Sequence, residues 1–105
     1  MLVNRGSASD YARWEEAGAS GWGPTEVLKY FKKSEDYRVE GGGNPTYHSQ
    51  GGNYPVSDVK YQNPLSAMFL EACQQFGIPK NDDFNDWSHS QVSDGVPPPL
   101  TPFLT

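Results

Sequence analysis

Apolar residues that recur at helical spacing predict three short helices in this chain. The first is expected from about Ser9 to Ala17, because Asp10 then lies in the first turn and Gly18 ends the helix. Tyr11 and Trp14 are three positions apart, so their rings share one face of this helix. We expect that face to pack against the rest of the protein.

The segment GWGPTEVLKYFKKSED predicts a second helix, from Pro24 to about Glu35, with Gly23 as its cap. Val27, Leu28 and Phe31 follow the spacing of a buried apolar stripe. Three lysines of the same segment lie on other faces of the helix, so we expect them to form an ordinary solvated surface.

The third helix has the clearest local signals, with Asn63 as its N-cap, Pro64 at the first helical position and Gly77 as the stop. Cys73 lies on its apolar stripe, and we expect it to be a small buried hydrophobic residue rather than a reactive thiol. The stripe consists of Leu65, Met68, Phe69, Ala72, Cys73 and Phe76.

The remaining segments predict loops and one strand. Residues 36–52 are rich in glycine and turn-forming residues, which indicates a loop; no helix start follows Gly41–Gly43, so we do not expect these glycines to hold a phosphate. Asn53–Lys60 alternates apolar and polar positions and predicts a strand in which Pro55 indicates a sheet edge. The proline-rich residues 93–105, which contain Pro97–Pro99, are expected to be extended or disordered.

Composition limits the size of the core and the class of partner. Leu, Ile, Val and Phe together supply only 19 of 105 residues, whereas 14 residues are aromatic. The net charge of −5 argues against a nucleic-acid-binding protein, because phosphate binding requires clustered cations. No apolar run is long enough to span a membrane, and no signal peptide is recognisable at the N-terminus. The single cysteine excludes an intrachain disulfide.

The residues alone indicate no catalytic or metal site. The GxSxG motif of serine hydrolases is absent, and His48 and His89 lack the spacing of known metal motifs. A metal site would therefore need Asp or Glu ligands that folding brings together. The carboxylate pairs Asp82-Asp83 and Glu15-Glu16 are interpreted as surface charge.

An ordered series of motifs resembles the glucose-methanol-choline (GMC) flavoprotein oxidoreductases. The first is RGSASDYARWEEAGASGWGPTEVLKYFKKSED, and YHSQGG, VSD, NPLSAMFLEACQQFGIP and DFN follow in the family's order over residues 1–90. The resemblance implies an α+β fold, mainly helical with one or two short strands, that joins the exit of the FAD domain to the start of the substrate domain. The GxGxxG motif that anchors FAD in this family is absent, and so is the dinucleotide-binding βαβ unit.

The same resemblance implies a function and a division of the chain. Residues 1–92 are expected to be an incomplete piece of an FAD-dependent oxidoreductase acting on CH–OH donors, inactive alone, with residues 93–105 as a divergent tail. The partner would be the remainder of the enzyme chain, and the backbone of Met1 and Leu2 would touch FAD in the complete enzyme. No catalytic residue of the family maps onto this chain.

Two alternatives remain open. GWGPTEVL and DFNDWSH resemble the branch of the family that contains the fatty acid photodecarboxylases, which implies a fatty acid substrate in place of an alcohol and allows a plastid location. The second alternative is a non-enzymatic interaction module that uses the proline-rich tail as a ligand. No targeting signal decides the compartment.

Overall fold

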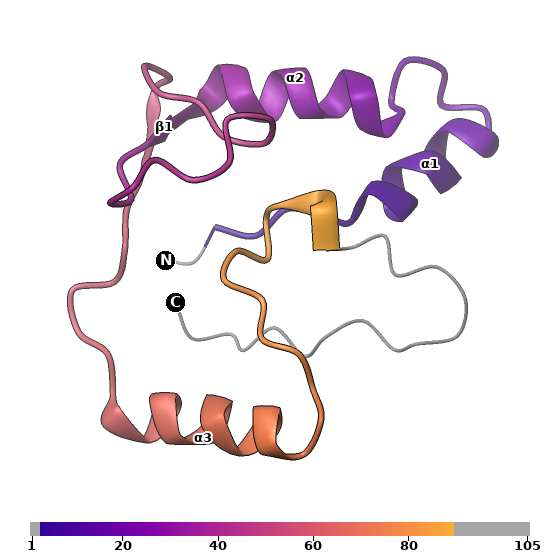
Figure 1. Ribbon diagram of the computed structural model, residues 1–105. Coiled ribbons are helices and arrows are strands. Elements are labelled where there is room, and N and C mark those ends of the chain that lie inside the picture. Colours follow the sequence, from indigo (N-terminus) through magenta and orange to yellow (C-terminus); the bar gives the residue numbers. More distant parts are fainter. Residues whose placement is uncertain (1–2, 90–105) are drawn as a thin grey trace.

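A computed structural model describes residues 3–89 of the chain (Figure 1). It contains three α-helices and two short strands, which agrees with the predicted α+β class. A single turn of 3-10 helix follows near the end of the described part. In chain order the elements are α1 (Ala8–Glu16), α2 (Pro24–Ser34), β1 (Glu35–Tyr37), β2 (Tyr54–Val56), α3 (Pro64–Gln75) and the 3-10 helix Trp87–His89.

The three helices begin and end within about two residues of the predicted positions because local signals determine their ends. Ser7 is the N-cap of α1, and its backbone N–H donates to the Asp10 carboxylate over 2.9 Å. The side chain of Asn63 accepts a hydrogen bond of 3.0 Å from the Leu65 N–H at the start of α3. Gly77 has a φ of 98°, the left-handed conformation that commonly ends a helix.

Strand β1 corrects the prediction that residues 36–52 form only a loop. It pairs in parallel with β2, and Glu35 lies opposite Tyr54 while Tyr37 lies opposite Val56. On the other side of β1, the Gly52 N–H donates to the Glu35 carbonyl over 3.0 Å. A Cβ atom at Gly52 would lie 2.4 Å from the backbone of residues 34 and 35, so only glycine permits this approach.

The predicted edge position of Pro55 is confirmed within the described residues. The sheet has two strands, and Pro55 lies at the centre of β2. Proline has no N–H, so the outer edge of β2 lacks a donor there for a further strand.

A small aromatic cluster forms the apolar core between α1 and α2. Tyr11, Val27 and Trp87 are buried, and Leu28 and Phe31 are among the partly buried residues that pack against them, as the stripe on α2 predicted. The Tyr11 ring lies 5.2 Å from that of Trp14, whose side chain nevertheless stays half exposed. The face of α1 therefore packs through Tyr11.

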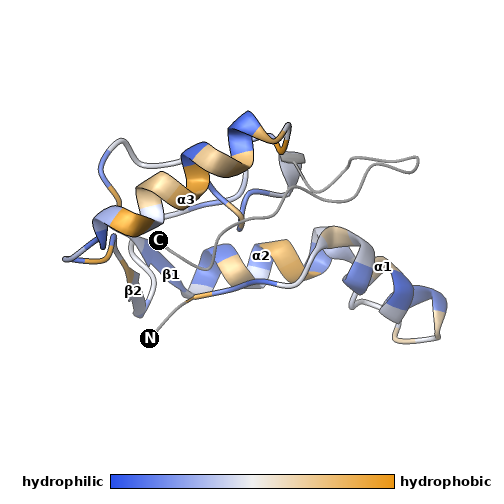
Figure 2. Cartoon of the chain, turned by 90° about the horizontal axis from the view of Figure 1, so that it is seen from below, coloured by the Kyte–Doolittle hydropathy of each residue, from blue (hydrophilic) through white to orange (hydrophobic). Residues whose placement is uncertain are grey.

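The apolar stripe of α3 is not buried within this chain, which corrects the expectation for that helix. No other helix or strand of the described residues packs closely against α3, and it lies apart from α1 and α2 (Figures 1 and 2). Phe69 is 55% exposed and Phe76 is 86% exposed. Cys73 is only partly buried.

Several expectations concern residues outside the described range. Met1, Leu2, the boundary at residue 92 and the tail with Pro97–Pro99 all lie there. Within residues 3–89, none of the helices combines the length and the apolar character that crossing a bilayer requires.

The uncovered face of α3 predicts self-association of the 105-residue chain. We expect sedimentation velocity to show species larger than a monomer that grow with concentration, because contact between copies removes apolar surface from water. The double variant Met68→Gln/Phe69→Gln retains good helix formers on α3 and should shift the population toward monomer. Tyr30→Gln, at a position on α2 that is 68% exposed, is the control. A monodisperse wild-type monomer at all concentrations would refute this prediction.

Candidate functional site

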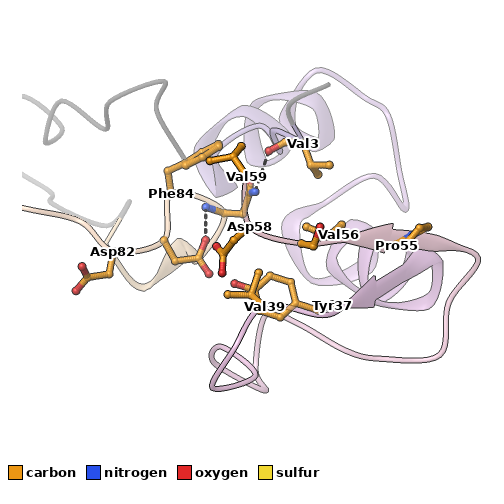
Figure 3. A pocket seen from close by; sticks show the side chains of 12 residues that line it. Val3, Tyr37, Val39, Pro55, Val56, Asp58, Val59, Asp82 and Phe84 are labelled. Atoms are coloured by element: carbon orange, nitrogen blue, oxygen red, sulfur yellow. Dashed lines mark hydrogen bonds between the residues drawn. The ribbon is translucent and has the colours of Figure 1, made fainter. Parts of the chain in front are cut away.

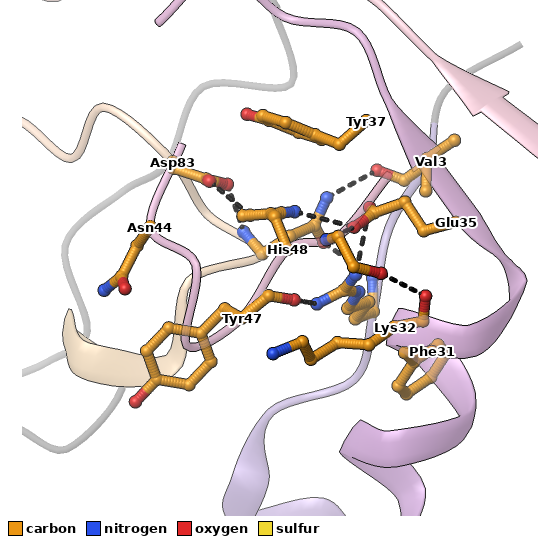
Figure 4. A network of polar contacts seen from close by, with 12 residues as sticks. Val3, Phe31, Lys32, Glu35, Tyr37, Asn44, Tyr47, His48 and Asp83 are labelled. Carbon is orange, nitrogen blue, oxygen red and sulfur yellow. Dashed lines mark hydrogen bonds and ion pairs between the residues drawn. The ribbon is translucent and has the colours of Figure 1, made fainter. Parts of the chain in front are cut away.

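Buried polar side chains gather where four segments of the chain meet (Figure 4). These segments are the N-terminal residues 3–6, the start of β1, the loop at residues 44–49 and the segment at residues 83–87. The buried polar residues of the described range are Arg5, Glu35, His48, Asn85 and Asp86. The described range has five of them and four buried apolar residues, so polar contacts form a substantial part of its interior.

Arg5 and Glu35 form a buried ion pair at the centre of the cluster. The Arg5 guanidinium lies 2.9 Å from the Glu35 carboxylate, and the two side chains are 3% and 5% exposed. A second nitrogen of Arg5 donates to the Tyr47 carbonyl over 2.7 Å, and the guanidinium lies over the Phe31 ring. Arg5 thus ties the N-terminal segment to α2, β1 and the following loop.

His48 bridges two carboxylates. Its Nδ1 lies 3.0 Å from the second oxygen of Glu35, and its Nε2 lies 2.6 Å from Asp83. The imidazolium ion donates from both ring nitrogens, which matches two carboxylate partners. The ring also stacks on Tyr37 with a centroid distance of 4.0 Å. Burial, and then the nearby charge of Asp83, raises the pKa of Tyr37 to about 12.

Asn85 closes these contacts into a ring. The other carboxylate oxygen of Asp83 accepts from the Asn85 backbone N–H over 3.0 Å. The Asn85 side-chain oxygen in turn accepts from the Arg5 backbone N–H over 2.8 Å. These contacts therefore form a closed path that begins and ends at Arg5. We call it the polar ring, and its members in order are Arg5, Glu35, His48, Asp83 and Asn85.

The polar ring is a satisfied network of hydrogen bonds and ion pairs. Every buried side-chain nitrogen and oxygen of the described residues has a hydrogen-bond partner. The same part of the chain contains no set of three or more His, Cys, Asp or Glu side chains suited to a metal ion. The arrangement can fix four chain segments relative to one another.

A cleft of about 220 Å³ lies beside the polar ring (Figure 3). Valine side chains and Phe84 form much of its lining, and Asp58, Asp82 and Asp83 add carboxylates. Tyr37 lines the cleft and also contacts the polar ring, because its side chain stacks on His48. The carboxylates make this cleft unsuitable for a phosphate or another anion.

The structure corrects the interpretation of one carboxylate pair. Asp82 is exposed and pairs with Lys80, as expected for surface charge. Asp83 instead turns inward to His48, with only 25% of its side chain exposed. The two ring nitrogens of His48 contact the carboxylates of Glu35 and Asp83. Met1 and Leu2, the predicted cofactor contacts, lie outside the described residues.

The polar ring was not predicted when His, Asp and Glu residues were considered type by type. The sequence nevertheless contained a signal for it. Its members lie in the strings that carry the family resemblance: Arg5 in RGSASDY, Glu35 in FKKSED, His48 in YHSQGG, and Asp83 and Asn85 in DFN. Polar residues inside such strings are candidates for buried contacts. Their pairing depends on the fold and cannot be read from spacing.

Removing the charge of Glu35 should destabilise the protein strongly. Glu35→Gln leaves Arg5 as a buried cation without its partner, which we expect to lower the free energy of unfolding by about 3 to 5 kcal/mol. Urea denaturation measures the change. Glu26→Gln is the matched control, because Glu26 pairs with Lys29 at an exposed site and should contribute less than about 1 kcal/mol. Equal losses in the two variants would contradict a buried, coupled pair.

Comparisons with known proteins give related sequences and a related structure. The chain is 42% identical over 90 residues to the chloroplastic fatty acid photodecarboxylase of Chlamydomonas reinhardtii, which covers 86% of this chain and 14% of that protein. It is 40% identical over 85 residues to human mitochondrial choline dehydrogenase, which covers 81% of this chain and 14% of that protein. A solved FAD-dependent oxidoreductase from Chaetomium thermophilum is 25% identical and superposes with a TM-score of 0.73, covering 82% of this chain and 16% of that one.

The family assignment rests on matches that cover most of the chain. The chain spans only 14% of the length of these two curated relatives, so their whole-protein activities extend far beyond the segment compared. The family model for GMC oxidoreductases matches residues 1–96. This match and the similarity to the relatives establish that the chain belongs to the GMC oxidoreductase family.

Proposed function

We propose that this chain is part of an FAD-dependent oxidoreductase that transfers a hydride from a CH–OH donor to FAD, and that it is inactive alone. The match of the GMC oxidoreductase family model to residues 1–96 is the observation that carries the proposal. The similarity to human mitochondrial choline dehydrogenase supports an alcohol as the donor. In this proposal, the partner of the chain is the remainder of the enzyme.

The chain's own contribution would be structural. The polar ring fixes the relative positions of residues 3–6, β1, the loop at His48 and the segment at Asp83. Its groups are satisfied by one another, so the reacting groups of the enzyme would come from other parts of the polypeptide. The uncovered apolar face of α3 is consistent with a segment that packs within a larger protein.

The described residues do not fit the pyrophosphate of FAD. A helix N-terminus binds phosphate through free N–H groups and its positive end. In α1 the Asp10 carboxylate already occupies this end, and α2 carries Glu26 in its first turn. In α3 the Asn63 side chain accepts from the N–H of Leu65. We therefore propose that FAD is held mainly by segments outside residues 3–89, with the backbone of Met1 and Leu2 as an additional contact.

A second function within the family has support from one relative. Light-driven decarboxylation of a fatty acid is supported by the 42% identity to the photodecarboxylase and by the strings GWGPTEVL and DFNDWSH, which resemble that branch of the family. The choline dehydrogenase is 40% identical, so similarity over this segment gives the two activities nearly equal support. The substrate-binding parts of the enzyme decide between an alcohol and a fatty acid. The alternative of a proline-rich interaction module concerns residues outside the described range.

A flavin titration tests whether the chain holds FAD by itself. We expect no saturable binding when FAD is added to the purified 105-residue chain, because the described residues offer no pyrophosphate site. Flavin and tryptophan fluorescence are the measurements, and the apoprotein of the Chaetomium thermophilum FAD-dependent oxidoreductase is the positive control. Saturable binding with one FAD per chain would contradict the proposed location of the cofactor site.

A chimera tests the oxidoreductase proposal directly. In human choline dehydrogenase, the 85 residues that match this chain would be replaced by the corresponding residues of this chain. We expect a yellow, flavin-containing protein with choline-dependent dye reduction. The same chimera with Glu35→Gln, which breaks the buried ion pair, is the matched control and should lose flavin content. A soluble chimera without flavin would contradict the proposal.

A further inference from the structure

The side chain of Asn85 makes two hydrogen bonds to one short piece of backbone. Its Oδ1 accepts from the Arg5 N–H over 2.8 Å, and its Nδ2 donates to the Val3 carbonyl over 3.1 Å. The N–H of a residue and the carbonyl two positions earlier point to the same side of an extended chain. Asn85 therefore binds residues 3–5 in the way that a neighbouring strand would.

Asparagine satisfies both contacts in one orientation of its side-chain amide. Reversing its amide would place NH₂ against the Arg5 N–H and oxygen against the Val3 carbonyl, so neither bond would form. Aspartate keeps an acceptor but has no donor, and leucine has neither. Asn85 is 8% exposed, so a lost bond would leave a poorly solvated backbone group.

Neighbouring contacts fix the position of Asn85 itself. Asp83 accepts from the Asn85 backbone N–H and holds His48 with its other oxygen. Two positions further, the Trp87 indole N–H donates to the Gly6 carbonyl over 2.9 Å. Residues 3–6 belong to no helix or strand, so side chains from 85–87 supply the directional contacts that a sheet would otherwise provide.

We propose that Asn85 is a positioning residue that sets the path of the chain at residues 3–5 and closes the 80-residue excursion between Arg5 and itself. Residues 3–6 and 85–87 lie side by side, so the first and last segments of the described range contact each other. The consequence for the enzyme rests on the proposed function. In a GMC oxidoreductase, this clamp, formed by the two side-chain hydrogen bonds of Asn85, would hold residues 3–5 against the segment at residues 85–87.

Amide hydrogen exchange on the 105-residue chain without FAD tests the clamp independently of the oxidoreductase proposal. The Arg5 amide should exchange slowly in the wild type because it donates to a buried acceptor. Asn85→Leu should accelerate its exchange about tenfold or more, and clearly more than the exchange of the Leu28 and Phe31 amides within α2. Asn85→Asp should retain more protection at Arg5 than Asn85→Leu, because the acceptor remains.

Asn53→Leu is the matched control, since it makes the same chemical change at an exposed asparagine. It should leave exchange at Arg5 unchanged. The proposal is overturned by an unprotected Arg5 amide in the wild type, by protection that survives Asn85→Leu, or by an aspartate variant that protects Arg5 less than the leucine variant. Equal acceleration at Arg5 and in α2 would also overturn it, because Asn85 would then serve general stability and not the path of residues 3–5.

Discussion

The buried ion pair between Arg5 and Glu35 is the constraint on which the described structure depends. Removing two charges from water is costly, so each must keep partners of good geometry. Glu35 uses one oxygen for Arg5 and the other for His48, and the path continues through Asp83 and Asn85 back to the Arg5 backbone. Because each group satisfies the next, a shift of one segment leaves a buried charge or donor unpaired elsewhere.

This arrangement explains how a chain with a thin apolar core holds its shape. The buried apolar residues of the described part are few, and Tyr11, Val27 and Trp87 form their only cluster. Trp87 joins this cluster to the polar ring, because its indole donates to Gly6 while its ring packs near Tyr11. The polar contacts supply direction, and the aromatic cluster supplies most of the apolar burial.

Two features of the described residues, the closed polar ring and the exposed apolar stripe of α3, are consistent with a segment of a larger oxidoreductase. The polar ring is closed within the described residues and its buried atoms have hydrogen-bond partners, whereas the apolar stripe of α3 is exposed. A segment of this kind can hold neighbouring parts of an enzyme in place without taking part in the reaction. Carboxylates or capping side chains occupy the N-terminal turns of its three described helices.

The sequence predicted those features that local physics determines. The ends of α3 follow from Asn63 and Gly77, because caps act within one turn. β1 was not predicted, because its three residues form a strand only by pairing with β2, about 20 residues later. The pairing of Asp83 with His48 spans 35 positions, and no periodicity encodes it.

For α3 the sequence predicted a contact that the described residues do not make, because the spacing of its apolar stripe is that of a buried face. Phe69 and the other large apolar residues of the stripe stay exposed, because no described element covers them. Periodicity therefore identified the face that prefers burial but not the surface that would bury it. The family resemblance found the strings that contain the polar ring without indicating how their residues meet.

The most direct test of the polar ring is a double-mutant cycle between Glu35 and Asn85, two members that are not adjacent along it. Free energies of unfolding are measured by urea denaturation for the wild type, Glu35→Gln, Asn85→Leu and the double variant. A closed ring predicts a coupling energy of about 0.5 to 3 kcal/mol, because breaking it at either point relaxes contacts shared by both residues. Additivity within about 0.3 kcal/mol would show that the two contacts act independently and would contradict the ring.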